Sequence, residues 1–391
     1  MDDNNEVAAP IDPNEAQGDT LTAGDTGTSD GPPVAPATRH DPDAAVGVKT
    51  RKDGKTESFY GYHEHTIVQV PDPGTGKDEE PRLITRFELT PASADVVDVS
   101  LSLLDRLGRP AETLIVDRHY SFKKPERWRD ELADRHIDQV LDLRADEHGF
   151  TELDHMRWAA GWPHCPATPD ILGTIERPAP AKDRDNSEAW KKFRSDIARR
   201  FNFAFRRVTS PDEMGVARYE CPASAGKIAC PLRGGTVETA VQFGLEVVEN
   251  PPTPGQPDFP LCCNQRTVTS DPGPLRKLMQ QHYWGLDDWE KEWNKRTYVE
   301  GSYGNRKNAS TENLRRGHFR LTGVAMVHIG TAMAAAAYNT RMIRNWHDRT
   351  GKGDPDHPLL QTHDGPGVAL RLTHEQYEQY CQEQRDREAS D

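Results

Sequence analysis

The chain has no uninterrupted run of about 18 apolar residues, so the sequence predicts no membrane-spanning helix. Its acidic first residues are not followed by an apolar segment of the kind found in secretory signals. Cysteine is scarce as well, with six among 391 residues. Without a secretory signal, so few cysteines favour reduced thiols in the cytoplasm and exclude a disulfide-rich scaffold.

Phe, Trp and Tyr are absent from residues 1–40, a segment rich in Asp, Pro, Gly, Thr and Ala. Low hydrophobicity with net negative charge cannot offset the entropy of ordering, so we predict that this segment is a disordered acidic linker. Residues 1–50 supply −8 of the formal net charge of −14. Residues 296–320 instead carry six Arg or Lys against two Glu. Because local charge decides a DNA-binding surface, the acidic total does not exclude DNA.

The hydrophobic pattern tightens after residue 58 and predicts alternating strands and helices. Such an order is typical of an α/β fold. The predicted elements are strands at 59–70 and 82–89, a helix capped by Ser93 and reaching Leu107, a strand at 112–117, a helix at 124–135 and a strand at 137–143.

Composition then divides the rest of the chain. Residues 145–288 are rich in Pro and Gly and hold five of the six cysteines, so we predict an inserted subdomain after a first core part at 41–144. Residues 289–350 return to a helical pattern and predict the second part of the core. The polar residues 351–391 predict a peripheral tail with a short helix near Thr373 to Arg387.

Four residues at helical spacing stand out near the end of the core: Trp293, Arg296, Glu300 and Lys307. Steps of three, four and seven residues place them close to one face of a helix. One interpretation is a surface helix with an ion pair between Arg296 and Glu300, worth roughly a few tenths of a kcal/mol. The other is a functional face.

Two further features favour the functional face. Gly301 and Gly304 follow Glu300, and small residues in a helix allow another backbone, such as that of DNA, to approach closely. Asp117 ends an apolar strand, where a carboxylate is costly to bury unless it is paired or binds a metal ion. A capping or turn role for Asp117 is the alternative.

The motifs LTPAS (Leu89–Ser93), LIVDRHYS (Leu114–Ser121), a long insertion and then W-x2-R-x3-E-x6-K occur in this order. The order resembles bacterial insertion-sequence transposases of the DDE class, one large group of which carries Y-x2-R-x3-E-x6-K. Trp293 stands in place of the Tyr. The resemblance covers roughly residues 41–350 and implies a ribonuclease H-like mixed sheet flanked by helices.

The resemblance also implies a chemistry. Two Mg²⁺ or Mn²⁺ ions, held by three carboxylates, would support DNA strand cleavage and transfer. Asp117 would be the second carboxylate and Glu300 the third. Trp293, Arg296 and Lys307 would contact DNA, with Trp293 stacking on a base or sugar or else packing in the core. Further DNA contacts are expected from Arg315, Arg316 and Arg320.

Expected partners follow from the same resemblance: double-stranded DNA at the element ends and at the target, and a second copy of the chain when assembled on DNA. The expected location is the bacterial cytoplasm, at the nucleoid. Two other functions stay open. One is a catalytically inactive DNA-binding remnant of a transposase, and the other is a zinc-stabilised interaction module unrelated to DNA.

The first carboxylate of such a site is not evident. Asp41 and Asp43, with Asp43 preferred, are candidates, but Pro33, Pro36 and Pro42 make the surrounding residues a poor strand. The resemblance therefore leads us to expect an N-terminally truncated or misannotated copy that begins after the first acid.

Cysteines of the insertion offer a possible structural zinc site. The candidate ligands are Cys221, Cys230, Cys262 and either Cys263 or Cys165. Zinc takes four N or S ligands, often with a C-x2-C pair, and no such pair occurs here. The alternative is that these cysteines are small buried hydrophobic residues.

Overall fold

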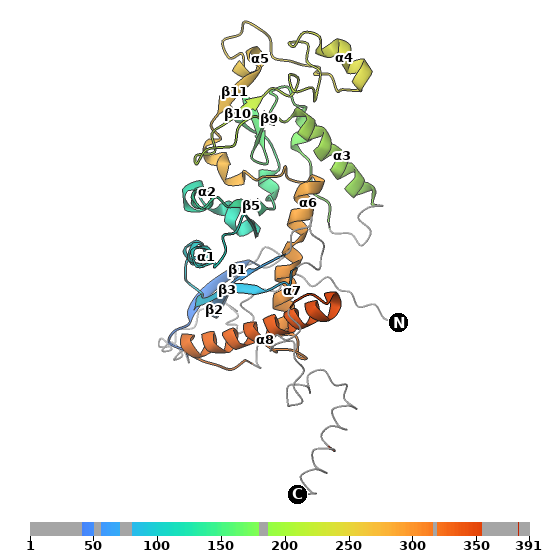
Figure 1. Ribbon diagram of the computed structural model, residues 1–391. Helices are drawn as coiled ribbons and strands as arrows, with labels where there is room; N and C mark the ends of the chain where they lie inside the picture. The colour runs from blue at the N-terminus through green and yellow to red at the C-terminus, as the bar shows by residue number, and fades with distance from the viewer. Residues whose placement is uncertain are drawn as a thin grey trace, which may run out of the picture.

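The computed structural model describes residues 41–50, 56–70, 80–179, 187–315, 319–353 and 382. The predicted linker at 1–40 and the predicted tail helix near Thr373 lie outside these residues. The fold is mixed α/β with several small sheets. In Figure 1 the insertion forms one end of the molecule, and the first sheet with helix α8 forms the other. None of the described helices is long and apolar enough to cross a membrane.

The first sheet is antiparallel with strand order β1-β2-β3. It consists of β1 (Ala45–Thr50), β2 (Thr56–Val68) and β3 (Ile84–Pro91), which confirms the two predicted strands to within a few residues. The long helix α8 (Val324–Thr350) covers the sheet because its apolar residues meet those of β2 and β3. Val68 and Ile84 pack against Tyr338 in one buried cluster. Tyr62 and Leu89 pack against Val327 in another.

A parallel strand pair follows along the chain. Strand β4 (Thr113–Val116) pairs with β5 (Asp138–Leu141), with Thr113 opposite Asp138. No ladder joins this pair to the first sheet within the described residues. The connecting helices are α1 (Val96–Asp105), the 3-10 helices η2 (Arg118–Phe122) and η3 (Pro125–Arg127), and α2 (Arg129–Asp134).

Two sequence predictions for these helices need correction. The cap of α1 is Asp95 and not Ser93, since the Asp95 carboxylate accepts a hydrogen bond from Val97 N at 2.8 Å. The predicted helix at 124–135 is divided into η3 and α2 at Trp128. That residue has a backbone conformation outside the helical region, and its ring is buried against Tyr120.

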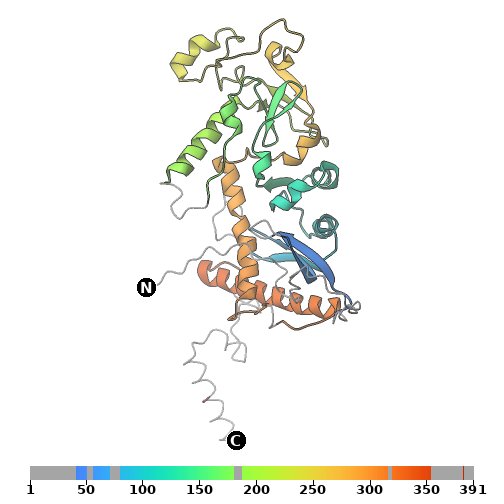
Figure 2. The same cartoon turned by 180° about the vertical axis from the view of Figure 1, so that it is seen from behind.

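The described residues of 145–288 share one hydrophobic core with the β4–β5 layer, because residues from Val97 to Trp293 belong to a single buried cluster. These residues form one end of the molecule, and Figure 2 shows two of their helices, α3 (Glu188–Phe203) and α4 (Thr236–Phe243), on the same side of it. Their elements are η4 (Ala145–Glu147), β6 (Thr151–Leu153), β7 (Met156–Ala159), β8 (Trp162–His164), η5 (Asp170–Gly173), α3 (Glu188–Phe203), β9 (Arg206–Arg207), β10 (Ala217–Glu220), α4 (Thr236–Phe243), α5 (Leu261–Asn264), β11 (Thr267–Ser270) and η6 (Gly273–Leu278).

Helices α6 (Asp287–Asn294) and α7 (Arg296–Lys307) run almost end to end between the two halves of the molecule (Figure 1). Helix α6 packs on β5, and α7 packs on β2 and α8. The single helix expected from Trp293 to Lys307 is thus two helices that meet at Lys295.

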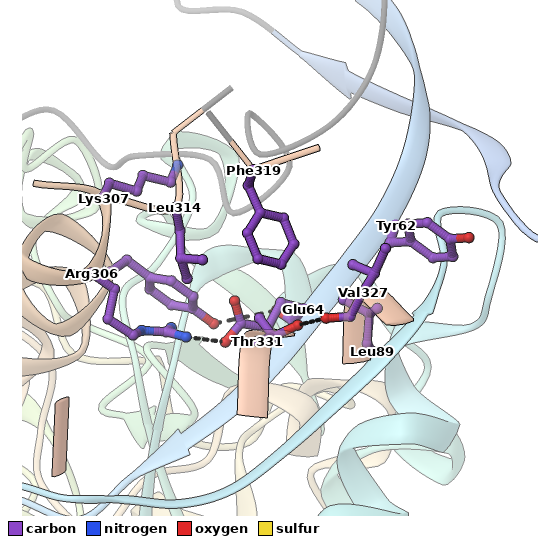
Figure 3. Close-up of a pocket in the computed structure, with 10 residues that line it drawn as sticks. Tyr62, Glu64, Leu89, Arg306, Lys307, Leu314, Phe319, Val327 and Thr331 are labelled. Atoms are coloured by element: carbon purple, nitrogen blue, oxygen red, sulfur yellow. Dashed lines mark hydrogen bonds and ion pairs between the residues drawn. The ribbon is translucent and has the colours of Figure 1, made fainter. Parts of the chain in front are cut away.

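A buried ion pair holds α7 on the first sheet. Arg306 Nη1 donates to Glu64 Oε1 at 2.6 Å, and the two side chains are only 1% and 9% exposed. Thr66 Oγ1 donates to the same carboxylate at 3.0 Å. Figure 3 shows Arg306 reaching Glu64 across a cavity that Lys307 and Tyr62 also line.

We predict that Arg306→Leu lowers the free energy of unfolding by about 3–5 kcal/mol, because it removes the charged partner described above from the buried Glu64 carboxylate and leaves the Thr66 hydroxyl. Urea denaturation of both proteins measures the difference. Lys191→Met, which removes the exposed ion pair of Lys191 with Glu188, is the matched control and changes stability little. A similar loss for both variants would contradict the role given to Arg306.

His65 on β2 makes stability depend on pH. Burial and, secondarily, neighbouring His63 lower the pKa of His65 to about 4 from an ordinary value of 6.5. Its Nε2 lies 3.0 Å from Thr90 Oγ1. Because the folded pKa lies below the unfolded one, the unfolded chain binds the proton first as the pH falls.

We predict that His65→Gln reduces the loss of stability between pH 6.5 and pH 4 by about 2 kcal/mol, allowing for solvent screening. Free energies of unfolding from urea titrations across this range measure the effect. If the free energy of unfolding falls with pH equally in the variant and the natural protein, His65 does not contribute to the pH dependence.

Candidate active site

Asp117 follows β4 directly, at the edge where the parallel strands β4 and β5 end. Its side chain is exposed, and the carboxylate accepts a hydrogen bond from His119 N at 2.9 Å as the cap of η2. The carboxylate at this position is therefore not buried. The capping role is real, and one backbone donor leaves most of the lone pairs of the carboxylate facing solvent.

Asp142 follows β5 at the same edge and was not identified from the sequence. It is 2% exposed, and it accepts hydrogen bonds from Arg118 Nε at 3.1 Å, Arg177 at 2.9 Å and Trp284 Nε1 at 2.8 Å. Two guanidinium groups thus compensate one buried carboxylate. The available signal was an acid directly after an apolar strand, as for Asp117. Asp142 fixes the side chain of Arg118, the residue next to Asp117.

Glu300 lies in the second turn of α7 and is paired with Arg296, one turn earlier. Both side chains are 33% exposed, so neither the surface pair nor the functional face is excluded by burial. The Arg296 guanidinium also lies over the Trp293 ring, 5.1 Å from its centroid. Helical spacing brings these three residues together as the sequence predicts.

Trp293 belongs to the core. Its side chain is 6% exposed, and its ring stacks on that of Trp289 with centroids 5.6 Å apart. The ring would have to leave this stack to contact a base, so the expected DNA contact gives way to the packing role. The Trp293 ring instead packs against the Arg296 guanidinium.

Tyr303, near Glu300, and Tyr120, near Asp117, interact electrostatically. Burial raises the pKa of the Tyr303 hydroxyl, and Glu64 and Tyr120 raise it further. Tyr303 is three residues after Glu300, and Tyr120 is three residues after Asp117. Among the described residues, however, no group of three or more His, Cys, Asp or Glu side chains is arranged to hold a metal ion. The described residues therefore do not assemble the three-carboxylate site that the resemblance implies.

Asp41 and Asp43, the candidates for the first acid, hold the start of α8. The Asp41 carboxylate is 8% exposed and accepts hydrogen bonds from Tyr62 Oη at 2.8 Å and Gly323 N at 2.9 Å. Asp43 Oδ2 accepts from Val324 N at 3.0 Å. Both acids cap a helix N-terminus, where the dipole favours negative charge.

The predicted basic residues lie in and after the last turn of α7. Lys307 is half-buried and lines the cavity beside Arg306 (Figure 3). Arg315 is exposed, with Nε donating to Asn313 Oδ1 at 3.0 Å, and Arg320 is exposed. Arg316 lies outside the described residues.

We compared the chain with known proteins in three ways. A scan against protein-family models and searches of the curated proteins and the solved structures each returned no match.

Proposed function

We propose that the chain is a transposase core of the DDE class, which cuts and joins DNA strands with the help of Mg²⁺ or Mn²⁺. The observation that carries the proposal is Asp117 at the carboxyl end of β4. It stands in the element order β1-β2-β3-α1-β4-α2-β5, with three antiparallel strands before two parallel ones. This is the order expected for a ribonuclease H-like core, and ligands of open α/β sheets lie beyond the carboxyl ends of the strands.

Asp117 and Glu300 fit hard cations because both offer carboxylate oxygens that solvent reaches. When bound, two such ions activate a water or a 3′-hydroxyl and stabilise the leaving oxygen. Asp117 and Glu300 would hold the ions. Arg296 would turn from Glu300 to a DNA phosphate, and Lys307, Arg315 and Arg320 would bind neighbouring phosphates.

The partners follow from this function. Double-stranded DNA at the element ends and at the target would be the substrate, and a second copy of the chain would join when two ends are paired. The place of action would be the nucleoid in the bacterial cytoplasm.

We predict that the intact chain nicks element-end DNA in the presence of Mg²⁺, and that Asp117→Asn and Glu300→Gln each lower the rate by roughly two orders of magnitude or more. Nicking of a labelled duplex that carries the end sequence measures the rate. Asp98→Asn, on the exposed side of α1, is the matched control and keeps the activity. DNA binding without nicking would contradict catalysis and support the inactive remnant.

The same variants test whether the two acids share an ion. Fe²⁺ replaces Mg²⁺, and peroxide and a reductant are added. The hydroxyl radicals formed at the iron then cut the protein backbone close to the bound metal. We expect cuts in both the Asp117 segment and α7, each lost in either variant. Cuts at one segment alone would separate the two acids.

We predict that Lys307→Ala, Arg315→Ala and Arg320→Ala each weaken DNA binding and each reduce the slope of log K against log salt by about 1, because each removes one phosphate contact. Fluorescence anisotropy across a salt series measures the slope. Arg199→Ala, which removes a partly exposed Arg from α3, keeps the natural slope. Equal slopes for all four variants would place the DNA elsewhere.

A further inference from the structure

Four cysteines that are far apart in the sequence line one cavity of the insertion: Cys165, Cys221, Cys230 and Cys263. Cys165 follows β8, Cys221 follows β10, Cys230 lies in the connection to α4, and Cys263 lies in α5. All four are free thiols. Four thiols from four segments around one cavity are unusual for cysteines that serve only as small apolar residues, since packing alone does not require them to meet.

Backbone hydrogen bonds hold all four positions in place, and that of Cys263 runs from its N to Pro260 O at 2.9 Å. Cys165 N donates to Phe203 O at 2.9 Å, and Cys221 N donates to Arg266 O at 3.0 Å. Cys230 is held through both its N and its O by Thr236 Oγ1, at 3.0 and 2.9 Å. The cavity therefore joins the end of α3, the antiparallel strand pair β10–β11 and the start of α4.

We propose that these four cysteines bind one structural Zn²⁺. As four S–Zn bonds form, the four thiols release four protons and no electron moves, so no oxidant or reductant takes part. Thiolate ligands select zinc over the hard cations of a phosphoryl-transfer site. Four protein ligands fill the tetrahedral shell and leave no position for substrate, which makes the role structural.

Arg233 supplies the charge that such a site needs. Four thiolates around Zn²⁺ carry a net charge of −2, and the Arg233 side chain lines the same cavity. Its Nη2 donates to Cys262 O at 2.9 Å, which fixes the guanidinium beside α5. A cation in this place stabilises the deprotonated thiols.

The ligand set differs from the one favoured by the sequence. Cys262 is buried but does not line the cavity, and Cys165 takes its place. No three of these thiols are yet close enough together to hold a metal ion. Rotation about χ1 moves a cysteine sulfur while its backbone stays in place, so metal binding would require new rotamers of these side chains.

Zinc content tests the proposal and does not depend on the proposed function. The full chain is purified under reducing conditions, incubated with Zn²⁺ and desalted, and its zinc is measured by elemental mass spectrometry. We expect one zinc per chain, most of it lost in Cys165→Ser and in Cys263→Ser. Cys262→Ser is the matched control and keeps its zinc.

Binding of Co²⁺ to the natural chain tests the metal site without relying on the folding of a variant. Co²⁺ bound to the natural chain should give the strong visible absorption of a tetrahedral four-thiolate site, and chelation of zinc should lower the Tm of the natural chain. A natural chain that takes up neither metal would overturn the proposal. So would zinc retained by Cys165→Ser and lost by Cys262→Ser.

Discussion

The placement of α7 depends on one buried contact, the ion pair between Glu64 and Arg306. Arg306 is almost fully buried, so its charge has to meet a carboxylate, and Glu64 is the one that β2 offers. The requirement fixes the rotation of α7 about its axis. Residues 300 and 306 are separated by six helical steps of about 100°, so fixing Arg306 also fixes the direction in which Glu300 points. A structural contact thereby decides which face of the helix is open to a ligand.

The other end of the α6–α7 pair is anchored by aromatic rings rather than charge. Trp289 stacks on Trp293 and donates from Nε1 to Gln280 Oε1 at 3.0 Å, while Trp284 donates to Asp142. These contacts attach α6 to the end of β5, where Asp142 also fixes Arg118. The helix pair is thus held by the strand pair at one end and by the first sheet at the other. Neither end can shift without disturbing a buried polar group.

The spacing of hydrophobic residues predicted the strands and helices better than it predicted the roles of single side chains. The strands around 59–70, 82–89, 112–117 and 137–143 are confirmed because alternation and apolar runs reflect burial directly. The roles of Trp293 and Arg306 could not be predicted, since helical spacing shows which residues share a face and not what covers that face. Asp142 was missed for a related reason: its partners are distant in sequence, and only the fold brings them together.

The pairing of Glu300 with Arg296 has a consequence for the proposed function. Two carboxylates that are to share a metal site repel each other unless positive charge compensates them. Arg296 supplies such a charge at Glu300, while the exposed Asp117 carboxylate accepts a hydrogen bond from His119 N. In the proposed function Glu300 would hold a cation, and the Arg296 guanidinium, which lies over the Trp293 ring, would bind a phosphate. The same Arg would thus pair with Glu300 in the free protein and with a DNA phosphate in the proposed complex, while the ion pair of Arg306 with Glu64 keeps the helix in place.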